Sequence, residues 1–294
     1  MTVSQTIGIA GLGLVGNALA ARWPARSRLV LGFDVDATKV AAFETLRPGS
    51  GRASISALAA DCDCLLISVF DDAQMMTVMD ALLQAHPRRV WQVVCITTAL
   101  PATLQAAGQR ARDAGLTFVE APISGSSAKI AAGEGRMFVG GNPEAIAALA
   151  PVLDAITAHR KIIGALGQAS AAKLSTNLVL GLNRMALAEG MALAESLGIA
   201  RANYLDLLLD SAATSRAAQE KGPMMAADRY TPPVATIAQH AKDVRLMLEL
   251  GRQSGQPLPL STLHQTLLQQ SMDRGDTDLD NAAIIRTLCA MRTP

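Results

Sequence analysis

The chain is poor in aromatic residues and in charge. Phe, Trp and Tyr make up 3% of its 294 residues, Asp, Glu, Lys and Arg make up 17%, and the formal net charge is +1. Few aromatic side chains leave little to stack against bases, and no basic stripe is present to attract phosphates. These deficits exclude nucleic acid as an expected partner. Half of the residues are hydrophobic, so a large core can be buried, and the length favours two domains over one.

Cysteine is also scarce, and no segment suits a membrane or a secretory signal. The four cysteines are Cys62, Cys64, Cys95 and Cys289. They lack the spacing of metal ligands, so buried free thiols in a reducing cytoplasm are expected, with no metal. The first strand pattern begins near residue 6, which leaves no room for a signal peptide. The most apolar long region, 164–197, contains charged residues and is not expected to span a membrane.

A glycine-rich turn follows the first apolar run of the chain. Gly11 allows a tight strand-to-helix turn, Gly13 lets the backbone approach a pyrophosphate, and Gly16 lets the helix pack closely on the strand. Free N–H groups at the start of the helix would hold the phosphates. The segment therefore predicts a dinucleotide-binding turn. Its residues are Gly11, Leu12, Gly13, Leu14, Val15 and Gly16.

An acidic residue ends the next apolar run. Asp34 lies eighteen positions beyond the last of these glycines, where a carboxylate can accept hydrogen bonds from the ribose hydroxyls of an adenosine. A carboxylate there repels a 2′-phosphate, so NAD is favoured over NADP. The alternative is that Asp34 caps the following helix, although Asp36 is better placed as a cap.

Short apolar runs alternate with helical patterns in the first half of the chain, which predicts βαβ units and a mainly parallel sheet. Strands are expected at 6–10, 29–34, 64–69, 90–95, 117–120, 136–140 and 160–163. After residue 164 the strand pattern stops, and helices are expected at 168–197, 201–212, 236–253, 259–273 and 281–291. The predicted fold is α/β: a Rossmann-type, doubly wound domain over 1–163, joined by a long helix to an all-α domain over 164–294.

Ligands of such sheets lie outside the carboxyl ends of the strands. This rule places Asp34, Val69, Phe70, Thr97 and Thr98 around the cofactor cleft. The loop 120–126 follows another strand. Its Ser124 offers a hydroxyl, and Gly125 and Ser126 offer N–H groups, a nest that suits a carboxylate or small oxyanion. An ordinary turn before a helix explains this loop equally well.

Lys173 and Asn177 are four residues apart and so share one helix face, among small and apolar residues. Partial burial would lower the pKa of Lys173 and suit it to exchange a proton with an alcohol or a carbonyl near neutral pH. A lysine that extends from an exposed stripe to solvent is the equal alternative. Near the C-terminus, adjacent Lys242 and Asp243 are expected to point in different directions, and His240 to be partly exposed.

Together these segments resemble the β-hydroxyacid dehydrogenase superfamily, specifically the 3-hydroxyisobutyrate dehydrogenase-like enzymes, along essentially the whole chain. The turn at 11–16 is similar to the family's cofactor fingerprint, with Val15 where methionine is frequent. Thr97-Thr98, followed by Pro101, resembles its Ser-Thr-x-x-Pro segment, whose threonine lies near the nicotinamide.

The resemblance implies roles for the remaining candidates. Lys173 falls on the family's catalytic lysine and Asn177 on its partner asparagine. Ser124 and Gly125 fall on the loop that contacts the substrate carboxylate. Lys242-Asp243 matches a pair that closes over cofactor and substrate, respectively.

The sequence also departs from the family pattern. Ser126 replaces the second glycine of the usual Ser-Gly-Gly loop, as in the glyoxylate and succinic semialdehyde reductase branch, to which tartronate semialdehyde reductases are also related. Ala169 replaces a glycine before the lysine. Ala235 occupies a position where many members carry an aromatic residue, which suggests a roomier substrate site. Asp34, in place of an Asn-Arg-Thr pattern, supports NAD.

The resemblance implies hydride transfer between NAD(H) and a small β-hydroxy acid or its semialdehyde, without a metal. The long apolar helix has more apolar surface than one small domain covers, so a homodimer or homotetramer is expected. One alternative is an imine reductase-like enzyme, but those generally lack the lysine. The other is a catalytically silent NAD-binding scaffold protein.

Overall fold

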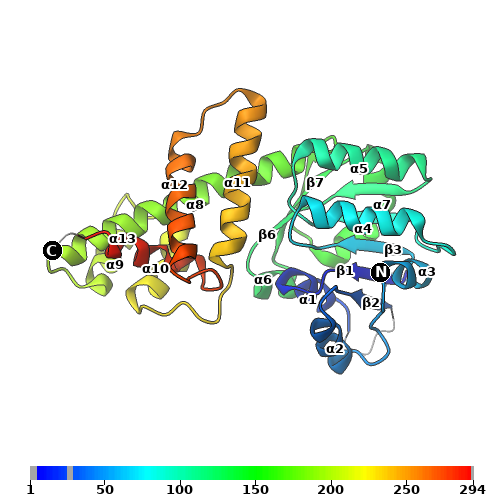
Figure 1. The fold of residues 1–294 in the computed structure, drawn as a ribbon, viewed down its shortest axis with the longest axis horizontal. Helices are drawn as coiled ribbons and strands as arrows, with labels where there is room; N and C mark the ends of the chain where they lie inside the picture. The colour runs from blue at the N-terminus through cyan, green and yellow to red at the C-terminus, as the bar shows by residue number, and fades with distance from the viewer. Residues whose placement is uncertain (1–4, 25–28, 293–294) are drawn as a thin grey trace. The chain divides into compact units, whose positions relative to one another are not determined.

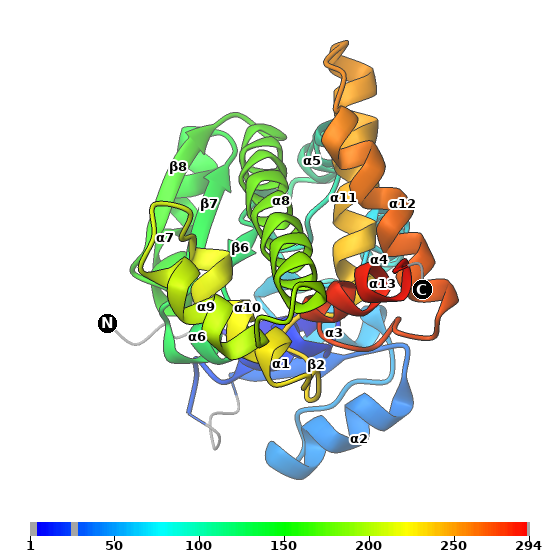
Figure 2. The same ribbon diagram turned by 90° about the vertical axis from the view of Figure 1, so that its left-hand side faces the viewer.

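Figure 1 and Figure 2 show the protein as a computed structural model, which describes residues 5–24 and 29–292. Internal contacts divide the chain into two compact units, Met1–Lys173 and Leu174–Pro294. The first is an α/β unit and the second is helical. Helix α8 (Gln168–Ser196) begins in the first unit and continues into the second.

The first unit is built on a mainly parallel sheet. Its described strands are β1 (Ile7–Ala10), β2 (Val30–Phe33), β3 (Cys64–Ile67), β4 (Gln92–Cys95), β5 (Thr117–Glu120), β6 (Ile123–Ser124), β7 (Arg136–Gly140) and β8 (Arg160–Gly164). Their order is β2-β1-β3-β4-β5-β7-β6, and β8 pairs with β7. Strands β1 to β5 run parallel, whereas β7 is antiparallel to both β5 and β6. This is the Rossmann-type sheet that the alternating pattern predicts.

Helices follow the strands of the first unit in turn. They are α1 (Leu14–Ala20), α2 (Ala37–Leu46), α3 (Ile55–Asp61), α4 (Asp72–Gln84), α5 (Pro101–Asp113), α6 (Ser127–Ala132) and α7 (Pro143–Ile156). Several begin where a side chain accepts a hydrogen bond from an N–H of the first turn, and Pro101 and Pro143 occupy first helical positions. The capping residues are Asp36, Ser54, Asp71, Ser126 and Asn142.

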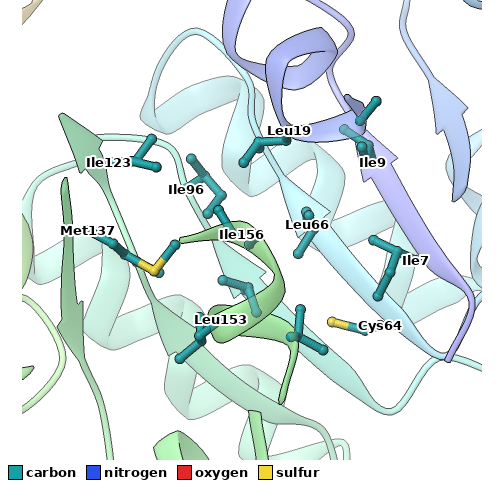
Figure 3. Packing of buried hydrophobic residues seen from close by; sticks show 14 of the residues in the cluster. Ile7, Ile9, Leu19, Cys64, Leu66, Ile96, Ile123, Met137, Leu153 and Ile156 are labelled. Atoms are coloured by element: carbon teal, nitrogen blue, oxygen red, sulfur yellow. The ribbon is translucent and has the colours of Figure 1, made fainter. Parts of the chain in front are cut away.

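Side chains alternate along the strands and build one apolar layer on each face of the sheet. Ile7, Ile9 and Leu66 pack with Leu153 and Ile156 of α7 on one face, as Figure 3 shows. The opposite face packs strand residues against α3, α4 and α5. Strands β1 to β5 are therefore largely buried on both faces, as is usual for parallel strands covered by helices.

The second unit is helical in its described residues. After α8 come α9 (Arg201–Leu209), α10 (Arg216–Ala226), α11 (Ile237–Ser254), α12 (Pro259–Asp273), a short 3-10 turn η1 (Asn281–Ala283) and α13 (Ile284–Ala290). Helices α11 and α12 lie side by side as an antiparallel pair in both views (Figure 1, Figure 2). Thr236 caps α11, and Gly255, with φ +71°, ends it.

A buried carboxylate organises the loops of the helical unit. Asp280 is fully buried, and its Oδ1 and Oδ2 atoms lie 2.7 and 2.8 Å from Nζ of Lys221. Oδ2 also accepts hydrogen bonds from the N–H groups of Val234 and Ala235, and Oδ1 accepts one from Ala282. The segment before α11 is thereby joined to the start of η1.

Most sequence-based elements are confirmed, but two elements of the structure were not predicted. The two-residue strand β6 was not predicted, because so short a strand has no alternating pattern. Helix α10 was not predicted either, since Gly222 and Pro223 within it are typical helix breakers. Cys62, Cys64 and Cys95 are buried as expected, but Cys289 is half-buried beside the guanidinium groups of Arg201 and Arg292.

No helix among residues 5–24 and 29–292 combines the length and the apolar character needed to cross a membrane.

Candidate active site

The glycine turn has the tight geometry that its sequence predicts. Gly11 has a φ of +97°, and a Cβ atom there would lie 2.2 Å from the carbonyl oxygen of Ser68. A Cβ on Gly16 would lie 1.9 Å from the carbonyl oxygen of Gly11. Gly13, at the start of α1, faces open space instead, since its Cβ would meet no atom within 4 Å. Two glycines are thus required by the fold, and the third leaves open space beside the start of α1.

Asp34 is held against this turn. Its Oδ2 accepts a hydrogen bond from the N–H of Leu12 at 2.7 Å, and its Oδ1 accepts one from the N–H of Asp36 at 2.9 Å. The side chain that caps α2 is that of Asp36, which accepts from the N–H of Thr38. The capping role considered as an alternative for Asp34 therefore falls to Asp36.

The loops after β3 and β4 meet at the same edge of the sheet. Thr97 Oγ1 accepts a hydrogen bond from the N–H of Val69 at 2.9 Å, which ties the two loops together. Phe70, the next residue, is exposed. Because β1 to β4 are parallel strands of one sheet, Asp34, Val69, Phe70 and Thr98 all follow carboxyl ends of strands at the same edge.

Lys173 meets the loop after β4. Its Nζ donates a hydrogen bond to Oγ1 of buried Thr98 at 2.7 Å, and the lysine side chain is half-buried. The lysine therefore does not extend from an exposed stripe to solvent. Two residues separated by 75 positions in the sequence are in direct contact.

The loop at 124–126 connects β6 to the short helix α6. Ser126 caps α6 by accepting a hydrogen bond from the N–H of Lys129 at 3.2 Å, and Gly125 has a φ of +132°. Ser124 is half-buried and Gly125 is exposed. A turn before a helix thus describes the backbone, and the hydroxyl and N–H groups of Ser124 and Gly125 remain candidates for binding an anion.

In the helical unit, Asn177 Nδ2 donates a hydrogen bond to Oδ2 of Asp243 at 3.3 Å. Lys242 Nζ lies 2.8 Å from Oδ1 of the same carboxylate. The expectation that Lys242 and Asp243 point in different directions is therefore wrong. Lys242 is buried, and its flexible stem lets the ammonium reach back to the adjacent carboxylate.

Comparison with known proteins identifies the family. Residues 6–167 match the NAD binding domain of 6-phosphogluconate dehydrogenase, and residues 167–288 match the NAD-binding domain of NADP-dependent 3-hydroxyisobutyrate dehydrogenase. An L-threonate dehydrogenase of Cupriavidus necator is 30% identical over 99% of both chains. The chain belongs to the 3-hydroxyisobutyrate dehydrogenase-like family.

Solved structures of this family have the same fold. A 3-hydroxyisobutyrate dehydrogenase from Salmonella typhimurium superposes with a TM-score of 0.82 at 25% identity, over 95% of this chain and 98% of that chain. A Mycobacterium tuberculosis 3-hydroxyisobutyrate dehydrogenase gives a TM-score of 0.83 at 23% identity, over 97% and 99% of the two chains. As a member of this family, the protein is an NAD(P)-dependent hydroxyacid dehydrogenase with an NAD(P)-binding domain.

His240 differs from its sequence-based expectation. It is buried rather than partly exposed, and its ring centroid lies 4.9 Å from that of buried His264 on α12. A Cβ on Gly181 would lie 2.8 Å from His240 Nε2, so this glycine makes room for the pair. Burial holds the pKa of His240 well below its usual range, helped by Arg184 and Lys221, and lowers the pKa of His264 to about 4, helped by Arg184.

This buried pair predicts acid sensitivity. Above the unfolded pKa near 6.5 both imidazoles are neutral in either state, whereas at lower pH the unfolded chain binds protons that the folded chain does not. We expect His264 alone to lower the free energy of unfolding by about 2 kcal/mol between about pH 7 and about pH 5. Urea unfolding of wild type and of His264→Gln at both pH values measures the difference. An equal pH dependence in the two proteins would contradict it.

Two buried charges were not singled out from the sequence. Glu120, at the end of β5, is fully buried, and Arg184, within α8, is buried. Each is a charged residue within an apolar stretch of the sequence, and this was the only local feature by which a buried charge could have been predicted. Their partners come from distant segments, so the sequence did not indicate their role.

Proposed function

We propose that the protein interconverts a small β-hydroxy acid and the corresponding carbonyl compound with NAD(H), and that Lys173 is its general acid and base. The observation that carries this proposal is the 2.7 Å contact between Lys173 Nζ and Thr98 Oγ1. It brings an ionisable amine to the carboxyl end of β4, the edge at which Rossmann-type sheets bind nicotinamide cofactors.

In the oxidation direction, a cofactor held at the glycine turn and Asp34 would supply the hydride acceptor for the hydroxyl-bearing carbon. The amine of Lys173 takes the proton of the hydroxyl group as the carbonyl forms, and the resulting ammonium returns it in the reverse reaction. Asn177 orients the reacting oxygen. Ser124, Gly125 and Ser126 hold the substrate carboxylate through hydroxyl and N–H groups.

We assign the adjacent pair at the start of α11 to binding. Lys242 contacts the cofactor and Asp243 the substrate, as the family resemblance implies. The 2.8 Å ion pair between the two side chains supports a common role in binding. Each side chain neutralises the charge of the other, so both can be held in a buried place before a ligand binds. We also propose that residues 1–163 form the NAD(P)-binding domain and residues 164–294 the domain for substrate binding and oligomerisation.

The substrate class is tested by a panel of acids. The Cupriavidus necator relative is named an L-threonate dehydrogenase. The family resemblance also suggests a roomier substrate site, because Ala235 stands where many members carry an aromatic residue. NADH formation is measured with L-threonate, 3-hydroxyisobutyrate and glycerate, and NADH consumption with glyoxylate and succinic semialdehyde. Turnover of at least one acid supports the proposal. Binding of NAD without any turnover would favour a silent scaffold.

We further propose NAD as the preferred cofactor, because Asp34 places a carboxylate beside the turn that binds the dinucleotide. In Asp34→Asn, repulsion of a 2′-phosphate is removed, and we expect the ratio of kcat/KM for NADP to that for NAD to rise roughly tenfold or more. Asp36→Asn is the matched control, because asparagine also caps helices and lies two residues away. An unchanged ratio in Asp34→Asn would contradict the assignment.

A homodimer or homotetramer remains our proposal for the assembly. Apolar side chains of α8 are exposed at Val179, Leu180 and Leu193, and a second copy of the chain would cover them.

A further inference from the structure

Glu120 is a buried carboxylate without a part in the reaction described above. It is the last residue of β5, and its side chain is fully buried. Gly140 on β7 leaves the space that it fills, because a Cβ there would lie 2.4 Å from Glu120 Oε1. A buried carboxylate is unfavourable unless its oxygens are hydrogen-bonded, so its partners indicate its role.

Those partners are N–H groups at the start of α8: that of Gly167, just before the helix, and those of Ala169 and Ser170 in its first turn. Glu120 Oε1 accepts hydrogen bonds from the N–H of Gly167 at 2.5 Å and of Ala169 at 3.1 Å, and Oε2 accepts one from Ser170 at 3.0 Å. The first N–H groups of a helix have no partner within the helix, and the helix dipole places partial positive charge there. Glu120 therefore caps α8 from a distant strand, with charge of the favourable sign.

The same residue is also anchored to the strand that leads to Thr98. Cys95 of β4 is the neighbour of Glu120 in the parallel ladder, and the N–H of Ala121 donates to the carbonyl of Cys95 at 2.7 Å. Thr98 follows Cys95 by three residues, and Lys173 follows Ser170 by three residues, or one helical turn. Glu120 thus links the two segments that present Thr98 and Lys173 to each other.

We infer that Glu120 is a positioning residue that sets the placement of Lys173 against Thr98 and supports the charged form of that lysine. The inference rests on the proposed role of Lys173. Burial raises the pKa of Glu120, while the N–H groups of Ala169, Ser170 and Gly167 oppose that shift. Cys95 is the ionisable group beside it in the sheet, and burial keeps that thiol protonated by raising its pKa.

The first test is Glu120→Gln, which keeps the shape of the side chain but removes its charge and turns an NH2 group toward N–H donors. We expect kcat to fall roughly tenfold to hundredfold, as a displaced catalytic group does, with the Kd for NAD unchanged. Gln168→Ala is the matched control. Gln168 also serves the start of α8, through a hydrogen bond from the N–H of Ala165 at 3.0 Å, but it carries no charge. Its kcat should stay at the wild-type value.

A second readout follows Lys173 directly and needs no turnover. Acetylation of the lysine by acetic anhydride is measured by mass spectrometry as a function of pH in the protein without cofactor. Loss of the negative charge held at Ser170, one helical turn before Lys173, favours the neutral amine, so in Glu120→Gln the reactivity profile should move to lower pH by roughly one unit. In Glu120→Asp the charge is kept but the reach is shortened, so kcat should fall while the profile keeps its wild-type position.

The outcomes separate this inference from the proposed function. If wild type shows no turnover, or Lys173→Ala is as active as wild type, the proposed function fails, and the acetylation profile still reports on Glu120. If wild type is active but Glu120→Gln keeps its kcat and its profile, the positioning role is wrong. Lower thermal stability with both readouts unchanged would make Glu120 merely structural. If Glu120→Gln does not fold, a wild-type kcat in Glu120→Asp overturns the inference.

Discussion

Lys173→Ala should bind NAD with the affinity of wild type and lose roughly 10²–10⁴-fold in kcat. The loss is expected because the substitution removes the amine to which we assign proton exchange with the substrate oxygen, while the glycine turn and Asp34 stay in place. Isothermal titration with NAD and steady-state kinetics with an active substrate measure the two quantities. A loss confined to KM would instead indicate that Lys173 only binds substrate.

Two further variants make this expectation specific. Lys173→Arg keeps a positive charge near Thr98 but cannot give up its proton at neutral pH, so its kcat should also be strongly reduced. Lys161→Ala removes an exposed lysine of β8 and should leave both quantities unchanged. Near-normal turnover of Lys173→Ala would refute the proposed mechanism, whatever the controls show.

The sequence was sufficient for features that depend on local patterns. The strands β1 to β5 follow apolar runs bounded by turn residues, and glycines at 11, 13 and 16 stand where a dinucleotide-binding turn needs them. The long helix α8 was also predicted, because its pattern contains no proline. In each case the interactions that determine the local structure involve residues a few positions apart, so the local sequence pattern is enough to predict that structure.

Contacts between residues that are distant in the sequence could not be predicted from local sequence patterns. Glu120 reads as an acidic residue at a strand end, and only the fold brings the N–H groups of Gly167, Ala169 and Ser170 to its oxygens. His240 reads as a partly exposed helix residue until His264, from another helix, is packed on it. Adjacent Lys242 and Asp243 lie on different sides of α11 by helical geometry, yet the length of the lysine stem brings their charges together.

Substitutions at two glycines of the turn should have different effects, one on stability and the other on cofactor binding. In Gly16→Ala the new methyl group would lie 1.9 Å from a backbone oxygen, which cannot move without displacing the turn after β1. We expect this variant to lose at least about 3 kcal/mol of stability, at the upper end of what overpacking costs. Thermal unfolding of the protein without cofactor measures the loss.

Gly13→Ala is the matched control for Gly16→Ala, because the same methyl group at residue 13 meets no protein atom within 4 Å and the backbone φ of −72° suits alanine. Its stability without cofactor should stay within about 0.5 kcal/mol of wild type. Its affinity for NAD should fall at least roughly tenfold, since the methyl group occupies the space that we assign to the pyrophosphate. If Gly13→Ala binds NAD as tightly as wild type, the open space beside α1 is not where the pyrophosphate lies. If Gly16→Ala is as stable as wild type, close packing is not what requires glycine at that position.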